Sequence, residues 1–248
     1  MSGVLDVAGL AKSFGGMPAV RGVGFGVAAG ELVAMIGPNG AGKTTCFNLL
    51  NGQLAADAGS VKLQGAEIVG LKAREIARLG VGRTFQITAT FASMTVRENV
   101  QMALLSHHRR LANWRTRAVD LYREEADRLL ERVGMHDQAG RACSVLAYGD
   151  LKRVELSLAL ANQPQLLLMD EPTSGMAAAE RGELMALTVA VARERRIAVL
   201  FTEHDMDVVF AHADRIIVLH RGQVIASGRP AEVRADPGVR EVYLGQGT

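Results

Sequence analysis

The sequence predicts an α/β fold built on a largely parallel sheet, and two observations support this prediction. First, short apolar segments that end in polar residues recur along the chain: ELVAMIG (31–37), QLLLMDE (165–171), IAVLFTEH (197–204) and RIIVLHRG (215–222). Continuous apolar runs of this length are typical of strands that are covered on both faces. Second, a helical pattern lies between QLLLMDE and IAVLFTEH, and strands that alternate with helices favour a parallel sheet.

The middle of the chain, from about Met94 to Val145, has a helical pattern instead. Apolar residues recur there at intervals of three and four, which places them on one helix face. These residues are Val119, Tyr122, Ala126, Leu129 and Val133. We therefore predict a single domain over residues 1–248, with a helical subdomain at about residues 94–160. We interpret the basic segment SHHRRLANWR (106–115) either as a solvated loop or as a contact surface.

Composition is that of an ordinary globular protein and excludes several classes. With 248 residues, of which 48% are hydrophobic, the chain can bury a full core. The net charge of +2 gives no reason to expect nucleic acid as a partner. Cys46 and Cys143 form no CxxC pair, so the sequence predicts neither a disulfide framework nor a zinc site. No apolar run approaches the ~18 residues of a membrane span, and no signal peptide is recognisable, so we expect a cytosolic protein.

The segment GPNGAGKT follows a predicted strand and opens a predicted helix at 45–50, which is the context of a phosphate-binding loop. Its glycines let successive backbone N–H groups point inward, and the helix N-terminus adds the positive end of its dipole. Lys43 is expected to reach the terminal phosphates, and the Thr44 hydroxyl to hold Mg²⁺. The predicted nucleotide-binding residues here are Gly37, Pro38, Asn39, Gly40, Ala41, Gly42, Lys43, Thr44 and Thr45.

The segment LLLMDE delivers two carboxylates to the carboxyl end of a strand, where open α/β sheets bind ligands. Asp170 is predicted to bind Mg²⁺ through water, and Glu171 to polarise the attacking water. Such a pair by itself is often a solvated edge or part of a salt bridge, but after a phosphate loop it indicates hydrolysis.

His204 in TEHD follows another apolar strand and is predicted to reach the same edge of the sheet as Glu171. There a neutral imidazole could bond a γ-phosphate oxygen or the nearby water. The alternative is a surface histidine paired with Asp205.

Gln86 and Phe14 are candidates that the sequence alone does not distinguish from ordinary residues. Gln86, in GRTFQ, could contact Mg²⁺ or water from a loop. Phe14 follows the first strand and could stack on adenine, although a lone phenylalanine more often belongs to the core.

The segment LAYGDLKR (146–153) directly precedes a long apolar-periodic run. Asp150 could cap that helix with its carboxylate, and Gly149 permits a turn that a side chain would forbid. The residues leave two interpretations open: a helix start only, or a backbone cradle for a phosphate.

Taken in order, GPNGAGKT, Gln86, the helical stretch, LAYGD, LLLMDE and TEHD resemble the ATP-binding subunit of an ABC transporter over nearly the whole chain. The resemblance implies a P-loop NTPase core of ABC type with a mostly parallel sheet, an N-terminal antiparallel β part and an inserted helical subdomain. It also implies hydrolysis of ATP with Mg²⁺ by two subunits paired head to tail. Each subunit would enclose ATP between its own phosphate loop and the LSGGQ segment of its partner.

LAYGD stands at the LSGGQ position and differs from it in three residues of five. Ala147 replaces the serine that would bond the γ-phosphate, which leaves the N–H groups near Gly149 and the helix dipole for that contact. The resemblance makes Ala147, Tyr148, Gly149 and Asp150 nucleotide contacts, with Asp150 turned aside to cap the helix. The segment SGMA (174–177) ends in alanine where relatives often have aspartate, which leaves the contact between the two ATP sites open.

The sequence LAYGD, the long middle segment and the C-terminal sequence DPGVREVYLG resemble those of one branch of this family. That branch serves the uptake of branched-chain amino acids, urea, short amides and aromatic acids. This implies membrane-spanning permease subunits, a second ATP-binding subunit (a similar chain or this chain itself) and, indirectly, an extracytoplasmic solute-binding protein. The chain would lie at the cytoplasmic face of the inner membrane, with the helical stretch and the Gln86 loop as its docking surface. Two alternatives stay open, a non-transport ABC-type ATPase and a phosphate-loop kinase, and the kinase would have no use for LAYGD.

Overall fold

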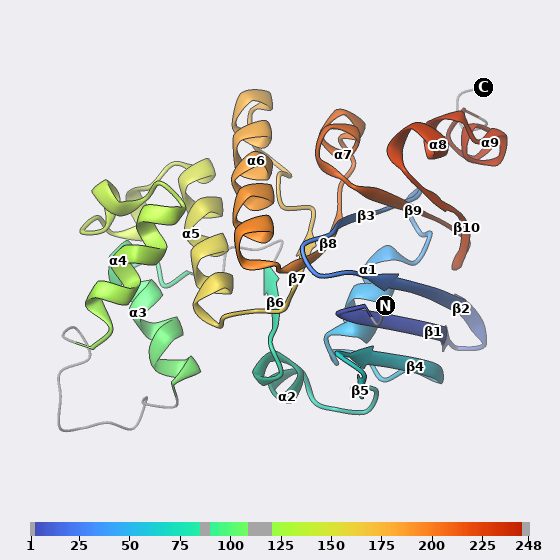
Figure 1. Cartoon of the computed structure of the whole chain (residues 1–248), viewed down its shortest axis with the longest axis horizontal. Helices are drawn as coiled ribbons and strands as arrows, with labels where there is room; N and C mark the ends of the chain where they lie inside the picture. The colour runs from blue at the N-terminus through green and yellow to red at the C-terminus, as the bar shows by residue number, and fades with distance from the viewer. Residues whose placement is uncertain (1–2, 85–89, 109–120, 245–248) are drawn as a thin grey trace.

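A six-stranded sheet forms the centre of the computed structural model, which describes residues 3–84, 90–108 and 121–244 (Figure 1). The strand order is β10-β9-β3-β8-β7-β6. Its members are β3 Leu32–Ile36, β6 Val81–Thr84, β7 Leu166–Asp170, β8 Ala198–Thr202, β9 Arg215–His220 and β10 Gln223–Gly228. All neighbours pair in parallel except β10, which is antiparallel to β9. The predicted parallel sheet is confirmed.

A separate antiparallel sheet of the order β2-β1-β4-β5 contains the N-terminal strands. Its members are β1 Leu5–Phe14, β2 Met17–Val27, β4 Ala58–Leu63 and β5 Ala66–Glu67. The turn between β1 and β2 consists of Gly15 and Gly16, whose φ angles are 55° and 82°. Two left-handed residues make the tight turn that matches the twist of a hairpin, and glycine adopts them without strain. The antiparallel β part is confirmed.

Helices and the second sheet cover both faces of the six-stranded sheet, which explains why its inner strands β3, β7 and β8 are buried along their whole length. Leu32, Ala34 and Ile36 of β3 lie in a core with residues of α5 (Tyr148–Ala161), α6 (Ala178–Arg195) and α7 (Met206–His212). The alternate residues, Val33 and Met35, lie in a second core with α1 (Lys43–Leu50) and the antiparallel sheet. Side chains alternate across a strand, so a strand buried on both faces needs apolar residues at every position.

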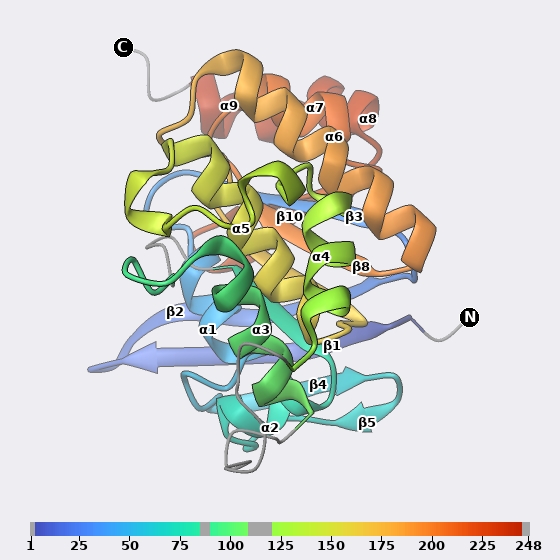
Figure 2. The same cartoon turned by 90° about the vertical axis from the view of Figure 1, so that its left-hand side faces the viewer.

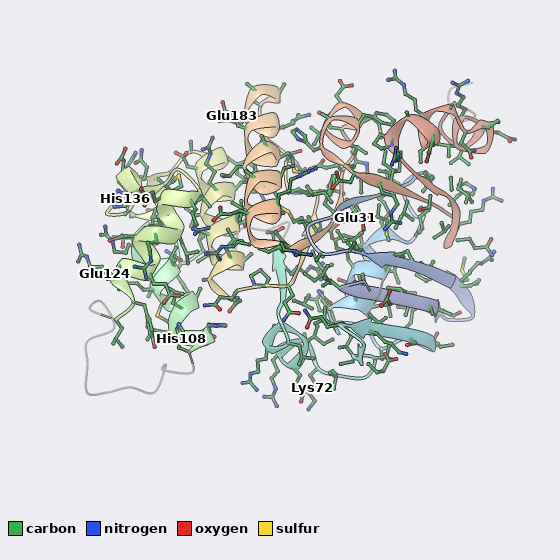
Figure 3. All side chains as sticks on the ribbon, viewed as in Figure 1. Glu31, Lys72, His108, Glu124, His136 and Glu183 are labelled. Carbon is green, nitrogen blue, oxygen red and sulfur yellow. The ribbon has the colours of Figure 1, made fainter. Side chains whose placement is uncertain are left out.

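The middle of the chain forms helices that lie beside the sheet, on the left of Figure 1 and facing the viewer in Figure 2. They are α3 (Val96–His107), α4 (Arg123–Arg132) and α5, with short 3-10 turns at His136–Gln138 and Cys143–Val145. His108, Glu124 and His136, labelled in Figure 3, all lie in this part. The predicted helical subdomain at about residues 94–160 covers these helices.

The predicted helix through Val119 to Val133 is shorter than the pattern indicated. Tyr122 has a left-handed φ of 57°, so α4 begins only at Arg123, and Val119 lies outside the described residues. Within α4, Ala126 and Leu129 are buried as expected. The remaining helices are α2 (Ala73–Arg78), α8 (Pro230–Ala235) and α9 (Pro237–Leu244). No helix in the described ranges is long and apolar enough to cross a membrane.

Candidate active site

The phosphate loop connects β3 to α1 and is built around close backbone approaches. A Cβ atom at Gly37 would lie 2.1 Å from the Leu219 carbonyl oxygen, and one at Gly42 would lie 2.6 Å from that of Ala19. Gly42 also has a φ of 104°, which favours glycine. Any side chain at these two positions would push the loop away from β9 and β2. The helix begins at Lys43, two residues earlier than predicted, because Gly42 acts as its N-cap.

Lys43 folds its side chain back over this loop. Its Nζ donates to the carbonyl oxygens of Gly37 at 2.6 Å and Pro38 at 3.2 Å. Burial lowers the pKa of the Lys43 amine, while the negative charges of Glu171 and Asp170 oppose that change. The ammonium thus lies among oxygen acceptors that a phosphate group could replace.

A cleft of about 200 Å³ lies beside the loop and brings together residues from distant parts of the chain. Glu171 and His204 line it opposite the loop, together with Ala19. The loop residues that line it are Asn39, Gly40, Ala41, Gly42, Lys43, Thr44 and Thr45. Because backbone N–H groups at a helix N-terminus attract anions, this cleft is suited to a polyphosphate.

Asp170 is buried at the end of β7, and two residues hold its carboxylate. Its Oδ1 accepts a hydrogen bond from the Thr202 hydroxyl at 2.7 Å. Its Oδ2 lies 3.5 Å from a guanidinium nitrogen of Arg83. The same guanidinium group donates to Asn48 Oδ1 at 2.9 Å and to Gln53 Oε1 at 2.7 Å. The carboxylate is therefore oriented, and through Arg83 it is connected to the helix that follows the phosphate loop.

Glu171 has a left-handed φ of 49°, which is uncommon for a residue with a side chain. Its backbone N–H donates to the Thr202 hydroxyl at 3.1 Å, which holds this conformation. One carboxylate oxygen lies 2.9 Å from His204 Nε2. Strained residues that the surroundings hold in place are frequent at active sites. The predicted meeting of Glu171 and His204 at one sheet edge is thus present.

The alternative pairing of His204 with Asp205 is absent from the described residues. Asp205 instead accepts from Arg181 at 2.7 Å and caps α7 through the N–H groups of Asp207 and Val208. His204 itself remains half exposed, at 52% of its side-chain surface. Among the described residues, Glu171 is the carboxylate with which it pairs.

The residues present fit a magnesium ion. Mg²⁺ keeps several waters and commonly takes one or two protein oxygens together with substrate phosphates, so it needs no cluster of carboxylates. Asp170 supplies an oriented carboxylate, and Thr44 is an exposed hydroxyl at the cleft. The role of these two residues as metal ligands stays a prediction, as does that of Gln86, which lies outside the described residues.

Phe14 does not line the cleft. It is the last residue of β1, is 48% exposed, and lies under the Lys12 ammonium at 5.8 Å from the ring centre. The exposure shows that it is not a core residue. Its stacking on adenine stays a prediction.

The LAYGD segment differs from expectation in two respects. The helix α5 begins at Tyr148 with Ala147 as its N-cap, and no side chain bonds the cap, so the prediction that Asp150 caps the helix is wrong. The cause is the bond from the Leu151 N–H to the Ala147 carbonyl, which places Asp150 inside the first turn. Gly149 is helical and makes no special turn; a Cβ there would lie 3.0 Å from Glu180 Oε1. The glycine therefore permits close approach of α6.

None of Ala147, Tyr148, Gly149 and Asp150 lines the cleft of its own chain. Tyr148 is 42% exposed, and its ring packs near Gly175 of the SGMA segment. These residues thus form a second surface, apart from the phosphate loop. Their contact with the nucleotide of another subunit stays a prediction.

Sequence reasoning missed three residues of the site: Arg83, Thr202 and Glu203. Thr202 bonds the predicted metal ligand, and Glu203 accepts from the N–H and hydroxyl of Thr173 at 2.8 and 2.7 Å. The available signal was a polar residue directly at the end of an apolar strand. The partners of Thr202 and Glu203 lie about thirty positions away in sequence, and Asp170 lies farther still from Arg83, so no local pattern reveals the contacts.

Comparison with known proteins agrees with this geometry. A family model described as ABC transporter matches residues 20–174, and one described as branched-chain amino acid ATP-binding cassette transporter matches residues 223–247. The chain is 39% identical to the high-affinity branched-chain amino acid transport ATP-binding protein BraF of Pseudomonas aeruginosa, over 98% of each chain. It is equally similar, at 39% over 98% of each chain, to LivG of Escherichia coli K12, whose description is the same.

Solved structures give the same result. An ATP-binding cassette of an ABC transporter in its ADP conformation is 30% identical and superposes with a TM-score of 0.87 over 99% of this chain and 100% of that one. A nucleotide-free ATP-binding cassette, also 30% identical, superposes with a TM-score of 0.85 over 97% and 98% of the two chains.

Proposed function

Since this chain belongs to the ATP-binding subunits of ABC transporters, we propose that its ATP hydrolysis drives import of branched-chain amino acids or a related small solute. Urea, short amides and aromatic acids are the related solutes. Within the structure, one observation carries the hydrolytic part of this proposal. Lys43 of the phosphate loop and the Glu171–His204 pair line one cleft, although they come from different strands of the sheet.

The residues of this cleft would have separate roles in hydrolysis. Lys43 would exchange its bonds to backbone carbonyls for bonds to the β- and γ-phosphates. Thr44 and Gln86, with Asp170 through water, would hold Mg²⁺, whose positive charge would stabilise the phosphates when it is bound. Glu171 would orient the attacking water, and His204 would hold the carboxylate and bond the γ-phosphate.

The LAYGD surface would act on a different nucleotide. Because Ala147, Tyr148, Gly149 and Asp150 lie apart from the cleft, they would complete the site of a second ATP-binding subunit. That subunit is a similar chain or a second copy of this one. The N-terminus of α5 would offer backbone N–H groups and the positive end of a helix dipole to the partner's γ-phosphate.

Permease subunits would hold the pair at the cytoplasmic face of the inner membrane, and an extracytoplasmic binding protein would deliver the solute. The test is purification of the tagged chain from its own cells in mild detergent, followed by reconstitution of the complex in vesicles. We expect integral membrane proteins to co-purify, and leucine to stimulate ATP turnover when its binding protein is added. The same chain carrying Lys43→Ala is the control for unspecific hydrolysis.

The outcomes separate the candidate functions. Stimulation by urea or an aromatic acid instead of leucine would replace the solute but keep the transporter. Purification without any integral membrane protein would overturn the proposal and favour the non-transport ABC-type ATPase.

A further inference from the structure

Three consecutive residues contact the end of β7 and the loop that follows it: Thr202, the last residue of β8, and the next two, Glu203 and His204. Thr202 bonds the Asp170 carboxylate at 2.7 Å, and His204 lies 2.9 Å from the Glu171 carboxylate. Between them, Glu203 bonds Thr173. The two outer residues thus hold the predicted metal ligand and the predicted water-orienting group, whereas the middle residue holds the loop itself.

Glu203 is nearly fully buried, with only 5% of its surface exposed. Its Oε1 accepts both the Thr173 N–H at 2.8 Å and the Thr173 hydroxyl at 2.7 Å. The N–H of His204 also donates to the carboxylate. Burial of a carboxylate costs free energy unless hydrogen-bond donors compensate it. Here three donors from two loops provide that compensation.

A second contact holds the far end of the same loop. Arg181 on α6 donates to the Met176 carbonyl at 2.8 Å and to the Asp205 carboxylate at 2.7 Å. The turn at 203–205 is therefore joined to the loop after β7 directly at Thr173 and, through Arg181, at Met176. Glu171 lies at the start of this loop and SGMA at its end, so the position of the loop determines where the Glu171 carboxylate and the SGMA segment lie.

Glu203 does not line the phosphate-loop cleft. It lines a neighbouring cavity of about 170 Å³ together with Thr173, Gly175, Arg181 and His204. It is thus placed to act on the reaction through its neighbours and not through direct contact with a phosphate.

We propose that Glu203 is a positioning residue for ATP hydrolysis: by accepting both hydrogen bonds of Thr173, it fixes the loop that carries Glu171 against the turn that carries His204. This inference rests on the proposed roles of Glu171 and His204. Misplacement of a reacting group by about 1 Å costs on the order of 100-fold in rate. Loss of this contact would therefore lower kcat while the phosphate loop continues to bind ATP.

The test compares Glu203→Ala, Glu203→Gln and Thr173→Val in the purified complex by steady-state ATP turnover. For Glu203→Ala we expect kcat to fall on the order of 100-fold, with the ATP affinity of the isolated subunit within about threefold of the wild type. Glu203→Gln keeps an acceptor oxygen for both bonds and should restore most of the rate. Thr173→Val removes one of the two bonds and should lie between, and adding it to Glu203→Ala should cause little further loss.

Two control variants separate positioning from simple loss of stability. Thr188→Val removes another buried hydroxyl bond, from Thr188 to the Leu184 carbonyl at 2.8 Å inside α6, without touching either loop. Glu183→Ala removes an exposed carboxylate on α6 that pairs with Arg153 at 2.6 Å (Figure 3). Both should leave kcat unchanged, and thermal unfolding of every variant shows how much stability each one loses.

The proposal is overturned if Glu203→Ala keeps kcat within threefold of the wild type, or if Glu203→Gln is as impaired as Glu203→Ala. It is also overturned if ATP affinity falls in parallel with kcat, because that result would indicate a general distortion of the site. The readout is ATP turnover and not solute uptake, so a wrong solute would leave these results unchanged.

Discussion

Replacing Glu171 by glutamine removes one negative charge and one proton acceptor from the cleft but keeps the size of the side chain. The glutamine oxygen can still accept a hydrogen bond from His204 Nε2, which lies 2.9 Å from the carboxylate. The left-handed backbone at this residue is held by Thr202 through the backbone N–H and is unaffected. Changes in rate would therefore report the chemistry of the carboxylate and not a collapse of the loop.

The size of the effect follows from the role assigned to the group. A positioned general base contributes ~10²- to 10⁴-fold to the rate, which corresponds to about 2.7 to 5.4 kcal/mol of barrier. The charge of Glu171 reaches the phosphate loop, since it raises the pKa of Lys43 against the effect of burial. Removal of that charge takes a repulsive group away from the phosphates, so the ATP dissociation constant should stay the same or fall.

The assay has two parts. Phosphate release by the purified complex gives kcat, and calorimetry gives the ATP affinity; size-exclusion chromatography with ATP should also reveal a closed pair that accumulates. Glu183→Gln, on the outer side of α6, is the control for loss of a carboxylate elsewhere. A kcat within about tenfold of the wild type would refute the assignment of Glu171, because a positioned general base typically contributes at least ~100-fold.

Three further predictions concern the phosphate loop, α5 and the acid stability of the fold. Lys43→Ala should raise the ATP dissociation constant at least about tenfold in calorimetry, since each charge-assisted bond is worth ~1.5 to 3 kcal/mol; unchanged affinity would exclude the loop as the site. Gly149→Asp places a Cβ 3.0 Å from Glu180 Oε1 and so disturbs the start of α5, which lies apart from the phosphate loop. ATP binding by the isolated subunit should therefore persist, while cooperative hydrolysis is lost. If both survive, α5 has no role in the partner's site. Burial lowers the pKa of His212, so as the pH falls the unfolded chain takes up that proton before the folded chain does, and the free energy of unfolding decreases below about pH 6.5. In urea titrations at pH 7 and 5.5, His212→Gln should reduce this decrease. An equal decrease in the variant and the wild type would contradict the prediction.

The phosphate loop and the buried strands could be predicted from sequence because each has a characteristic local residue pattern. The glycines of the phosphate loop mark backbone that no side chain tolerates, and the apolar strands β3, β7 and β8 are buried along their whole length, as continuous apolar runs predict. The start of α5 could not be read in this way. Asp150 is a favoured N-cap residue, yet the contacts of Tyr148 with Gly175 and of Gly149 with Glu180 accompany an earlier start.

The sequence by itself predicted a phosphate-binding loop and determined which apolar segments become strands, because both depend on neighbours within a few positions. Only the tertiary structure decided which strand ends meet. The order β3-β8-β7 is not the order along the chain, and it places His204 and Glu171 beside Lys43, over a hundred residues away in sequence. Strand pairing depends on long-range packing and backbone hydrogen bonds, which local patterns do not encode. For the same reason, the bond between Glu203 and Thr173 became visible only once β7 and β8 lay side by side.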